Sequence, residues 1–282
     1  MSPSAGSSEN CISNVRKALG TIYRLSQTHE GRQELGPALR LCNPDGLKTP
    51  QDAQAIAFAT MGAFGNLAMG NYPYPSSYLM AGAVELPAYP VRAACENLAP
   101  DFGDDDLAVV AGLRDARVTQ SCYFPTSAPG DANSTAIDMV NFFGYLECSE
   151  LYMPMSSDGV NDVFPRHSAD EAVDDANCVA SWGVHLRPEW AEIQYGGLKA
   201  INASSNIVFS NGNYDPISAT GVLATLSDSL VAVPIEGGAH HLDLFFTHPL
   251  DPLSVTQARE TEKQHMRHWV REFYERKGER LG

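Results

Sequence analysis

The spacing of apolar residues near the N-terminus is that of a helix. Apolar side chains recur there at steps of three and four positions, the period of an amphipathic helix, at Ile12, Val15, Leu19, Ile22 and Leu25. We therefore predict a helix over residues 12–25.

A second helix is predicted to begin at Pro50. Thr49 can cap its first turn, Pro50 suits the first helical position, and Asp52 stands where a capping box places an acid. Residues 53–84 contain no charged side chain. Because asparagines, glycines and prolines interrupt this stretch, a buried helix followed by a proline-rich loop is favoured over a membrane span.

Residues 100–135 are predicted to be rich in loops, because prolines and a glycine follow a run of three aspartates at Asp104–Asp106. The run lacks the spaced ligands of an EF-hand calcium site. We interpret it as a solvated loop.

The pattern changes after residue 200. Ile207–Phe209 and Leu230–Val233 are short apolar runs bounded by polar residues and glycine, which is typical of buried strands in a parallel sheet. A helix is predicted from about Pro252, with Asp251 as its cap and with one apolar face formed by Met266, Trp269, Val270 and Phe273. This order of elements indicates an α/β architecture.

The composition is that of a folded, acidic protein. The chain has 282 residues, of which 44% are hydrophobic and 19% are charged, so it can fill a core. Its 34 acidic residues exceed its 19 basic ones and give a formal charge of −15. Nucleic acid would be repelled by such a surface, so no nucleic-acid partner is expected.

Six cysteines are spread along the chain without a C-x-x-C pair that would indicate zinc or a redox motif. Their even number is compatible with three disulfides and an oxidising compartment. Sequons at Asn133 and Asn202 favour glycosylation at these two positions. The first residues have neither the basic nor the apolar region of a signal peptide. This conflict suggests that the chain is a piece of a longer protein.

Two polar side chains follow the two predicted strands. Asp215 comes after the first strand, and His240 comes after the second, 25 residues later. Catalytic groups gather at this edge of open α/β sheets, and an acid before a histidine is the order of α/β-hydrolase triads. In that interpretation Asp215 orients the imidazole and His240 moves the proton. The alternative is an Asx-turn at Asp215 and an ordinary loop histidine at His240.

Metal binding is the less favoured interpretation of the same region. Side chains of the ligand type stand close together at His240, His241, Asp243 and His248. Adjacent histidines do not easily face one ion, and the Glu-x-x-His at Glu262–His265 has no second copy. We therefore predict no metal site and no cofactor.

Longer segments resemble a known family. In chain order they are Met69–Pro75, Leu86–Val91, Val160–Phe164, Trp182–Val184, Asn206–Pro216, Gly238–Leu244 and Asp251–Val255. Together they resemble the serine peptidases of family S28, which include prolyl carboxypeptidases and dipeptidyl peptidases. The resemblance extends from about Cys11 to Tyr274.

The resemblance implies an α/β-hydrolase fold. Residues 1–180 would form a mainly helical cap (insertion) region and its connection to the core, and residues 181–282 the C-terminal part of the hydrolase core. Asp215 would be the acid of the triad, and His240, the first histidine of the pair, would be the base. The implied disulfides join Cys11 to Cys95, Cys42 to Cys122, and Cys148 to Cys178.

The resemblance also implies a substrate and a location. The substrate would be a peptide with proline or a small residue near the scissile bond. The family resides in lysosomes or outside the cell, and some members form homodimers. No membrane partner is expected for this chain.

The sequence departs from the family pattern at two places. No glycine is followed by Ser at the second and Gly at the fourth position, so the nucleophile elbow is absent. In the family that serine lies upstream of the region matching Cys11. Ile217 stands where the family has a tryptophan of the proline pocket, which puts prolyl specificity in doubt. Met153 matches a substrate-pocket residue, although a plain core methionine is equally compatible.

We therefore predict a serine exopeptidase of the prolyl carboxypeptidase or dipeptidyl-peptidase type by family. The isolated chain is expected to show little or no turnover, because it lacks the nucleophile. The alternative is a non-catalytic pseudo-enzyme, or a binding remnant of that fold.

Overall fold

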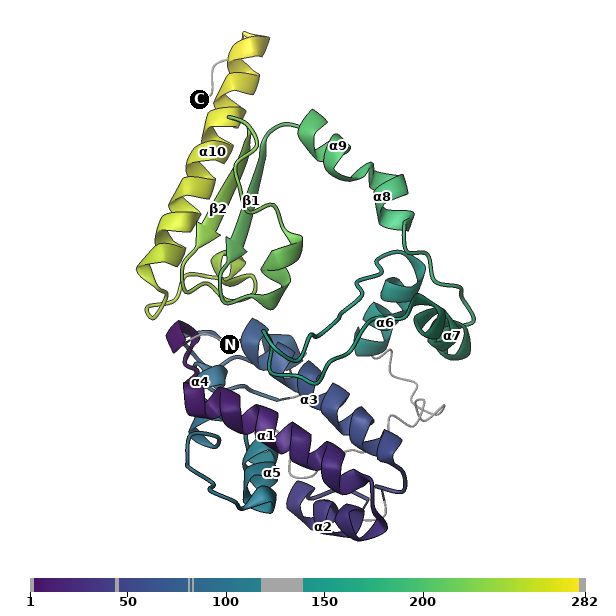
Figure 1. The fold of residues 1–282 in the computed structure, drawn as a ribbon. Helices are drawn as coiled ribbons and strands as arrows, with labels where there is room; N and C mark the ends of the chain where they lie inside the picture. Colours follow the sequence, from purple (N-terminus) through teal and green to yellow (C-terminus); the bar gives the residue numbers. More distant parts are fainter. Residues whose placement is uncertain (1–2, 44–45, 81, 83, 118–138, 279–282) are drawn as a thin grey trace. The chain divides into compact units, whose positions relative to one another are not determined.

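The computed structural model describes residues 3–43, 46–80, 82, 84–117 and 139–278. The chain divides into two compact units, which are described separately here. The helical unit comprises Ser7–Phe64 and Ala93–Gly197, and the strand unit comprises Met1–Gly6, Gly65–Arg92 and Leu198–Gly282. The described part is thus a mixture of helices and a small sheet (Figure 1).

The helical unit contains α1 (Glu9–Ser26), α2 (His29–Leu39), α5 (Asp106–Asp115), α6 (Met139–Ser149), α7 (Glu171–Trp182) and α8 (Trp190–Tyr195). Three further helices have residues in both units: α3 (Pro50–Met69), α4 (Pro90–Glu96) and α9 (Gly197–Ala203).

Helix α1 confirms the predicted amphipathic helix. Ser8 caps it by accepting a hydrogen bond from the Cys11 N–H at 3.2 Å. The predicted apolar stripe is buried, with Val15, Leu19 and Ile22 at most 1% exposed. Through this stripe α1 packs against α2 and α5 (Figure 1).

Helix α3 begins at Pro50, as predicted. One Asp52 carboxylate oxygen accepts hydrogen bonds from the backbone N–H groups of Lys48 and Thr49 at 2.8 and 2.7 Å, which satisfies donors at the helix start. Across the described residues, no helix has both the length and the apolar character needed to cross a membrane.

The prediction of loops over residues 100–135 is wrong for Asp106–Asp115, which form α5. Asp105 caps this helix by accepting a hydrogen bond from the Ala108 N–H at 2.9 Å, and Asp106 lies in its first turn. Acidic side chains favour a helix N-terminus because of the helix dipole. The aspartate run is therefore a helix start signal. Residues 118–135 lie outside the described residues.

Two disulfides lie in the helical unit, between Cys11 and Cys95 and between Cys148 and Cys178. They are the pairs that the family resemblance implies. Cys42 is also disulfide-bonded. Its implied partner, Cys122, lies outside the described residues.

The strand unit confirms the predicted parallel strands. Strands β1 (Ile207–Gly212) and β2 (Leu230–Ile235) pair in parallel, with Ile207 opposite Leu230. Helix α10 (Leu253–Lys277) packs along both strands (Figure 1). Short 3₁₀ helices complete the described part of the unit: η1 (Pro3–Ala5), η2 (Tyr78–Met80), η3 (Pro216–Thr220) and η4 (Leu242–Leu244). Its core contains the buried residues Tyr72, Val233, Ile235, Ala239, Leu242, Val255 and Ala258.

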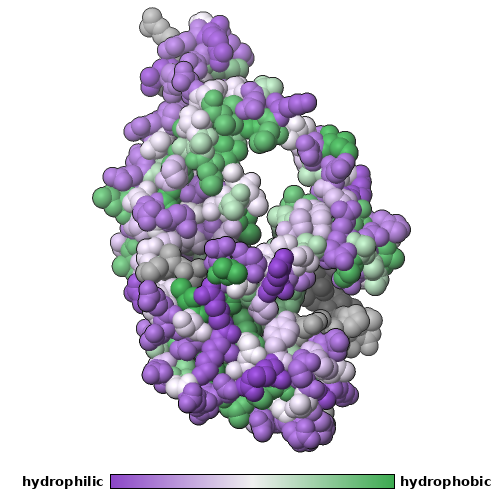
Figure 2. Space-filling view, viewed as in Figure 1, coloured by the Kyte–Doolittle hydropathy of each residue, from purple (hydrophilic) through white to green (hydrophobic). Residues whose placement is uncertain are grey.

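Two expectations for α10 are wrong. Asp251 does not cap the helix: its carboxylate pairs with Arg259 and accepts a hydrogen bond from the His248 N–H. The predicted apolar face is only partly buried. Trp269 is 9% exposed, whereas Met266, Val270 and Phe273 are each about half exposed. Hydrophobic side chains accordingly reach the surface of this unit (Figure 2).

Candidate active site

The ends of the two parallel strands bring Asp215 and His240 together. Asp215 follows β1 and His240 follows β2, so both lie at the same edge of the sheet. The Asp215 Oδ2 atom lies 2.7 Å from His240 Nδ1, the distance of a charge-assisted hydrogen bond. The side chains are 11% and 18% exposed, so water screens this contact only weakly.

Asp215 uses its two carboxylate oxygens for different purposes. Oδ1 accepts a hydrogen bond from the Ile217 N–H at 2.9 Å and so caps η3. Oδ2 contacts His240. The turn interpretation and the histidine-orienting interpretation of the sequence are therefore compatible, because the turn holds the carboxylate while leaving one oxygen for the imidazole.

The two strand-end loops touch through glycine backbone. A Cβ atom added to Gly212 would lie 2.2 Å from the carbonyl oxygen of Gly238, a distance that no side chain permits. The Tyr214 N–H also donates to that carbonyl at 2.9 Å. The absence of a side chain at Gly212 thus permits the close approach that brings Asp215 to His240.

The backbone of His240 is fixed from both sides by residues near the end of α3. Its N–H donates to the Met69 carbonyl at 3.0 Å. Its carbonyl accepts a hydrogen bond from the Tyr72 hydroxyl at 2.7 Å. Tyr72 is 1% exposed; its ring stacks on Tyr74 and makes a tilted contact with Phe245. Sequence reasoning placed Met69–Pro75 among the family-like segments but missed this role.

His241 stacks on His240, with ring centroids 3.7 Å apart. Its Nδ1 atom lies 3.3 Å from the Tyr78 hydroxyl. Burial lowers the pKa of His241, and the neighbouring His240 lowers it further. His241 also has a left-handed backbone, with φ of 58°, which a non-glycine residue adopts only where its surroundings hold it.

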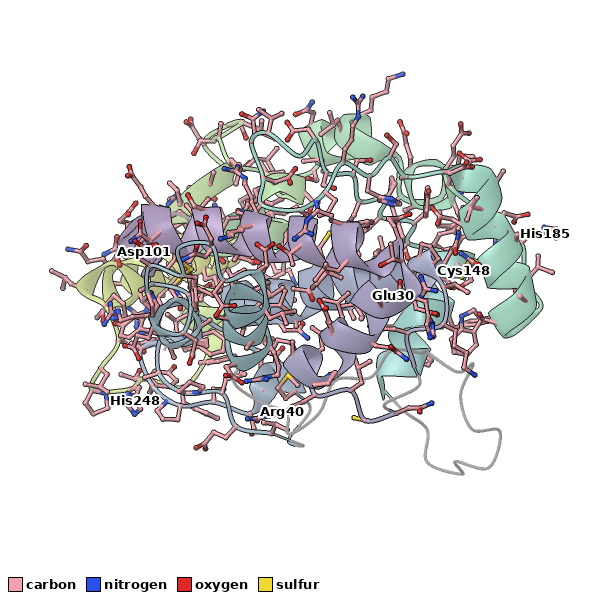
Figure 3. All side chains as sticks on the ribbon, turned by 60° about the horizontal axis from the view of Figure 1, so that its bottom comes forward. Glu30, Arg40, Asp101, Cys148, His185 and His248 are labelled. Carbon is pink, nitrogen blue, oxygen red and sulfur yellow. A yellow bond between two sulfur atoms is a disulfide. The ribbon has the colours of Figure 1, made fainter. Side chains whose placement is uncertain are left out.

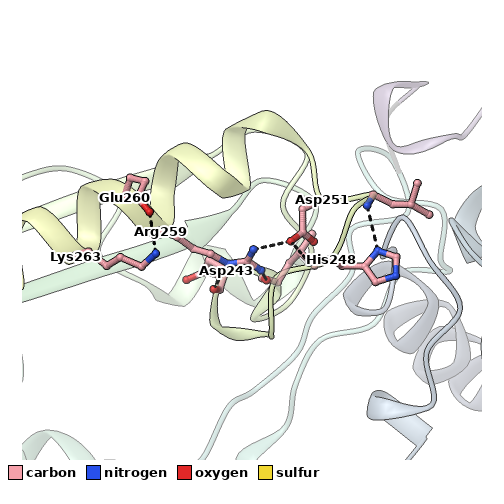
Figure 4. A network of polar contacts seen from close by, with 8 residues as sticks. Asp243, His248, Asp251, Arg259, Glu260 and Lys263 are labelled. Atoms are coloured by element: carbon pink, nitrogen blue, oxygen red, sulfur yellow. Dashed lines mark hydrogen bonds and ion pairs between the residues drawn. The ribbon is translucent and has the colours of Figure 1, made fainter.

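A buried polar network joins the turn that follows His241 to α10 (Figure 4). Arg259 of α10 donates to the carbonyls of Leu242 and Asp243 at 2.8 and 2.7 Å and to Asp251 at 2.5 Å. Ser210 of β1 donates to the Asp243 carboxylate at 2.7 Å. Ser210 is therefore a structural donor rather than a nucleophile for His240.

The residues considered for a metal do not converge on one point. His240 pairs with Asp215, Asp243 accepts from Ser210, and His248 Nδ1 accepts from the Leu250 N–H at 3.1 Å. Among the residues that the structure describes, no group of three or more His, Cys, Asp or Glu side chains is arranged to hold a metal ion.

The remaining predicted residues lie elsewhere. Ile217 is in η3 of the strand unit and is 37% exposed. Met153 lies in the segment that connects α6 to α7 in the helical unit, and its side chain is half-buried. Asn202 is exposed on α9, whereas Asn133 lies outside the described residues.

A second histidine–aspartate contact occurs in the helical unit. His185 Nδ1 lies 3.1 Å from Asp175, but the His185 side chain, labelled in Figure 3, is 81% exposed. A hydrogen bond from the Leu186 N–H lowers the pKa of Asp175, and His185 lowers it further. This contact stabilises a solvated turn, and it provides a matched control for the Asp215–His240 pair.

Comparison with known proteins gives a consistent result. Residues 3–262 match the family profile described as serine carboxypeptidase S28. The chain is 38% identical over 277 residues to lysosomal Pro-X carboxypeptidase of Homo sapiens, covering 96% of this chain and 53% of that protein. It is 27% identical over 274 residues to prolyl carboxy peptidase like protein 5 of Caenorhabditis elegans, covering 92% and 53%. The chain thus spans about half the length of these curated relatives.

Proposed function

The chain belongs to the serine carboxypeptidase S28 family, and we propose that it supplies the acid and the base of a serine exopeptidase. The observation that carries this proposal is the 2.7 Å contact between Asp215 Oδ2 and His240 Nδ1 at the edge of two parallel strands. In the complete fold, residues 181–282 would belong to the α/β-hydrolase core and residues 1–180 to a mainly helical cap and its connection.

The proposed chemistry uses the two nitrogens of His240 differently. Nδ1 is hydrogen-bonded to Asp215, so Nε2 is the nitrogen that would take the proton of a serine hydroxyl as it attacks the peptide carbonyl. The Asp215 carboxylate would stabilise the imidazolium that forms. The imidazolium would then return the proton to the leaving amine, and water would release the acyl group in a second cycle.

The nucleophilic serine would come from a segment outside this sequence, because the sequence has no Gly-x-Ser-x-Gly elbow. Two contacts attach the first described residues to the strand unit. The Tyr214 hydroxyl donates to the Ser4 carbonyl, and the Asn71 amide donates to the Ala5 carbonyl at 3.0 Å. Ser4 and Ala5 therefore pack within the strand unit, and Ser4 lies next to the Asp215 loop.

We propose a peptide substrate with proline or a small residue near the scissile bond, as the names of the Pro-X carboxypeptidase relatives suggest. We propose Met153 and Ile217 as substrate-binding residues, and isoleucine in place of the family's tryptophan would widen the specificity beyond proline. A lysosomal or secreted location, glycosylation at Asn133 and Asn202, and a homodimer complete the proposal.

The test uses the native protein, whose mass and translated start are first determined by intact-mass spectrometry. A fluorophosphonate probe, which labels activated serines, and a Pro-X peptide then report activity. We expect Asp215→Asn and His240→Gln to reduce turnover roughly a thousandfold or more. The matched changes Asp175→Asn and His185→Gln should leave it within about twofold, because that pair is solvated.

Two outcomes would overturn the proposal. Full turnover in the His240→Gln protein would exclude His240 as the base. A native protein that begins at Met1 and takes no probe would favour the alternative function, a non-catalytic protein that retains the fold.

A further inference from the structure

Two acidic side chains, Asp243 of η4 and Glu262 of α10, lie in the region where the turn after His241 packs against the C-terminal helix. Asp243 of η4 is 7% exposed, and its Oδ2 atom accepts a hydrogen bond from Ser210 at 2.7 Å. Glu262 lies three residues along α10 from Arg259, which donates to the Asp243 carbonyl, so it is on the helix face that packs against η4. The Glu262 Oε1 atom is buried and has no hydrogen-bond partner in the described part of the chain.

The nearby cations do not neutralise these two groups. The Arg259 guanidinium donates to the backbone carbonyls of Leu242 and Asp243 and to the Asp251 carboxylate. Lys263 is paired with Glu260 at 2.8 Å (Figure 4). Two carboxyl groups are thus held together at a poorly solvated place, and ionising both would cost Coulomb and desolvation free energy.

We propose that Asp243 and Glu262 share one proton at acid pH. The resulting hydrogen bond holds the turn after His240 and His241 against α10. In the protonated state Glu262 donates a hydrogen bond to the Asp243 carboxylate. In the ionised state the two carboxylates repel each other, and η4 loses this attachment to the helix. The inference concerns the stability of the strand unit and does not depend on the proposed peptidase activity.

The titration is expected near neutral pH. Burial and the adjacent Asp243 raise the pKa of Glu262 to about 7, while Arg259 and Lys263 lower it by less. In the unfolded chain the same carboxyl titrates near 4.5. Because the folded pKa is the higher one, the stabilisation is fully present below pH of about 4.5 and is lost as the pH rises through about 7. Burial lowers the pKa of the nearby His241, while Asp215 and Asp243 raise it by less.

The first test observes the proton directly. Carbon-13 NMR of the protein labelled at the glutamate carboxyl carbon follows every Glu resonance from pH 4 to 8. The resonance that disappears in Glu262→Gln identifies Glu262. We expect it to titrate near neutral pH, and to move to a lower pH in Asp243→Asn. A Glu262 carboxyl with an ordinary pKa, or with a pKa that is unchanged in Asp243→Asn, would overturn the proposal.

The second test measures thermal unfolding of the strand unit. Trp182→Phe and Trp190→Phe leave Trp269 of α10 as the single tryptophan reporter, since the chain has three tryptophans. The Tm of this parent should fall by several degrees from pH 5 to pH 7.5. Glu262→Gln, which stays neutral and can still donate, should remove that fall.

Glu275→Gln is the matched control, because Glu275 is exposed on the same helix. It should keep the fall in Tm of the parent protein. A fall that is unchanged in Glu262→Gln would overturn the proposal. If Glu262→Gln does not fold, Asp243→Asn takes its place in the same measurement, with the same two outcomes.

Discussion

Replacing Arg259 with methionine should destabilise the strand unit by about 3–5 kcal/mol, the usual cost of breaking a buried ion pair by removing one partner. The side chains of Arg259 and Asp251 are 9% and 2% exposed, so water cannot replace the lost contact. Methionine retains the apolar stem but removes the guanidinium donor from three acceptors: the Leu242 and Asp243 carbonyls and the Asp251 carboxylate. The loss falls on the turn that follows His240.

Urea unfolding of the single-tryptophan protein measures this cost, because Trp269 lies on the same helix as Arg259. Arg259→Lys should give a smaller loss, since lysine keeps the charge but not the planar fork that reaches several acceptors at once. Asp251→Asn should also destabilise the protein. The loss of stability in the double variant should be smaller than the sum of the two single-variant losses by about 0.5–3 kcal/mol, because both substitutions remove the same contact.

Two results would refute this reasoning. The first is a loss below about 0.5 kcal/mol in Arg259→Met, the range of a surface substitution. The second is strict additivity with Asp251→Asn, which would mean that the two side chains do not stabilise each other. Glu275→Gln on the same helix serves as the surface reference.

Two further predictions concern the support of the site and of the helical unit. Tyr72→Phe should cost about 1–3 kcal/mol in urea unfolding, because the buried His240 carbonyl loses its donor while the ring remains; Tyr195→Phe, on a side chain 68% exposed, should cost nothing measurable. Replacing both cysteines of the Cys11–Cys95 disulfide with alanine should cost more than the same change at Cys148–Cys178. Loop-closure entropy gives a stabilisation of about 4.6 kcal/mol for Cys11–Cys95 and about 3.7 kcal/mol for Cys148–Cys178, because the closed loops span 84 and 30 residues. Far-UV circular dichroism in urea measures both, and the reverse order would contradict the prediction.

Local patterns in the sequence were sufficient to predict the two strands and parts of two helices. The apolar runs after residue 200 predicted β1 and β2 and their parallel pairing, and residues 12–25 predicted α1. Asp215 and His240 could be expected to meet because each follows a parallel strand, and the ends of such strands share one edge of the sheet. The start of α3 at Pro50 followed from capping chemistry within four residues.

Sequence reasoning failed where one local signal had two meanings. The aspartate run at residues 104–106 was interpreted as a solvated loop, although acidic residues also favour the first turn of a helix, as they do in α5. Asp251 precedes α10 in the position of a cap, yet its carboxylate accepts from Arg259, which lies two turns along the helix. Whether a carboxylate before a helix caps it, forms an ion pair or does both, as Asp215 does, is decided by packing.

The sequence by itself therefore determined the periodic elements and the edge of the sheet where Asp215 and His240 meet, because these depend on residues close together in the chain. Only the tertiary structure decided what surrounds that pair: the Tyr72 hydroxyl on the His240 carbonyl, the Arg259 network, and the packing of η4 against α10. Those contacts join segments separated by up to 168 positions. Their energies depend on burial and on the donors that remain free after packing, which no local pattern records.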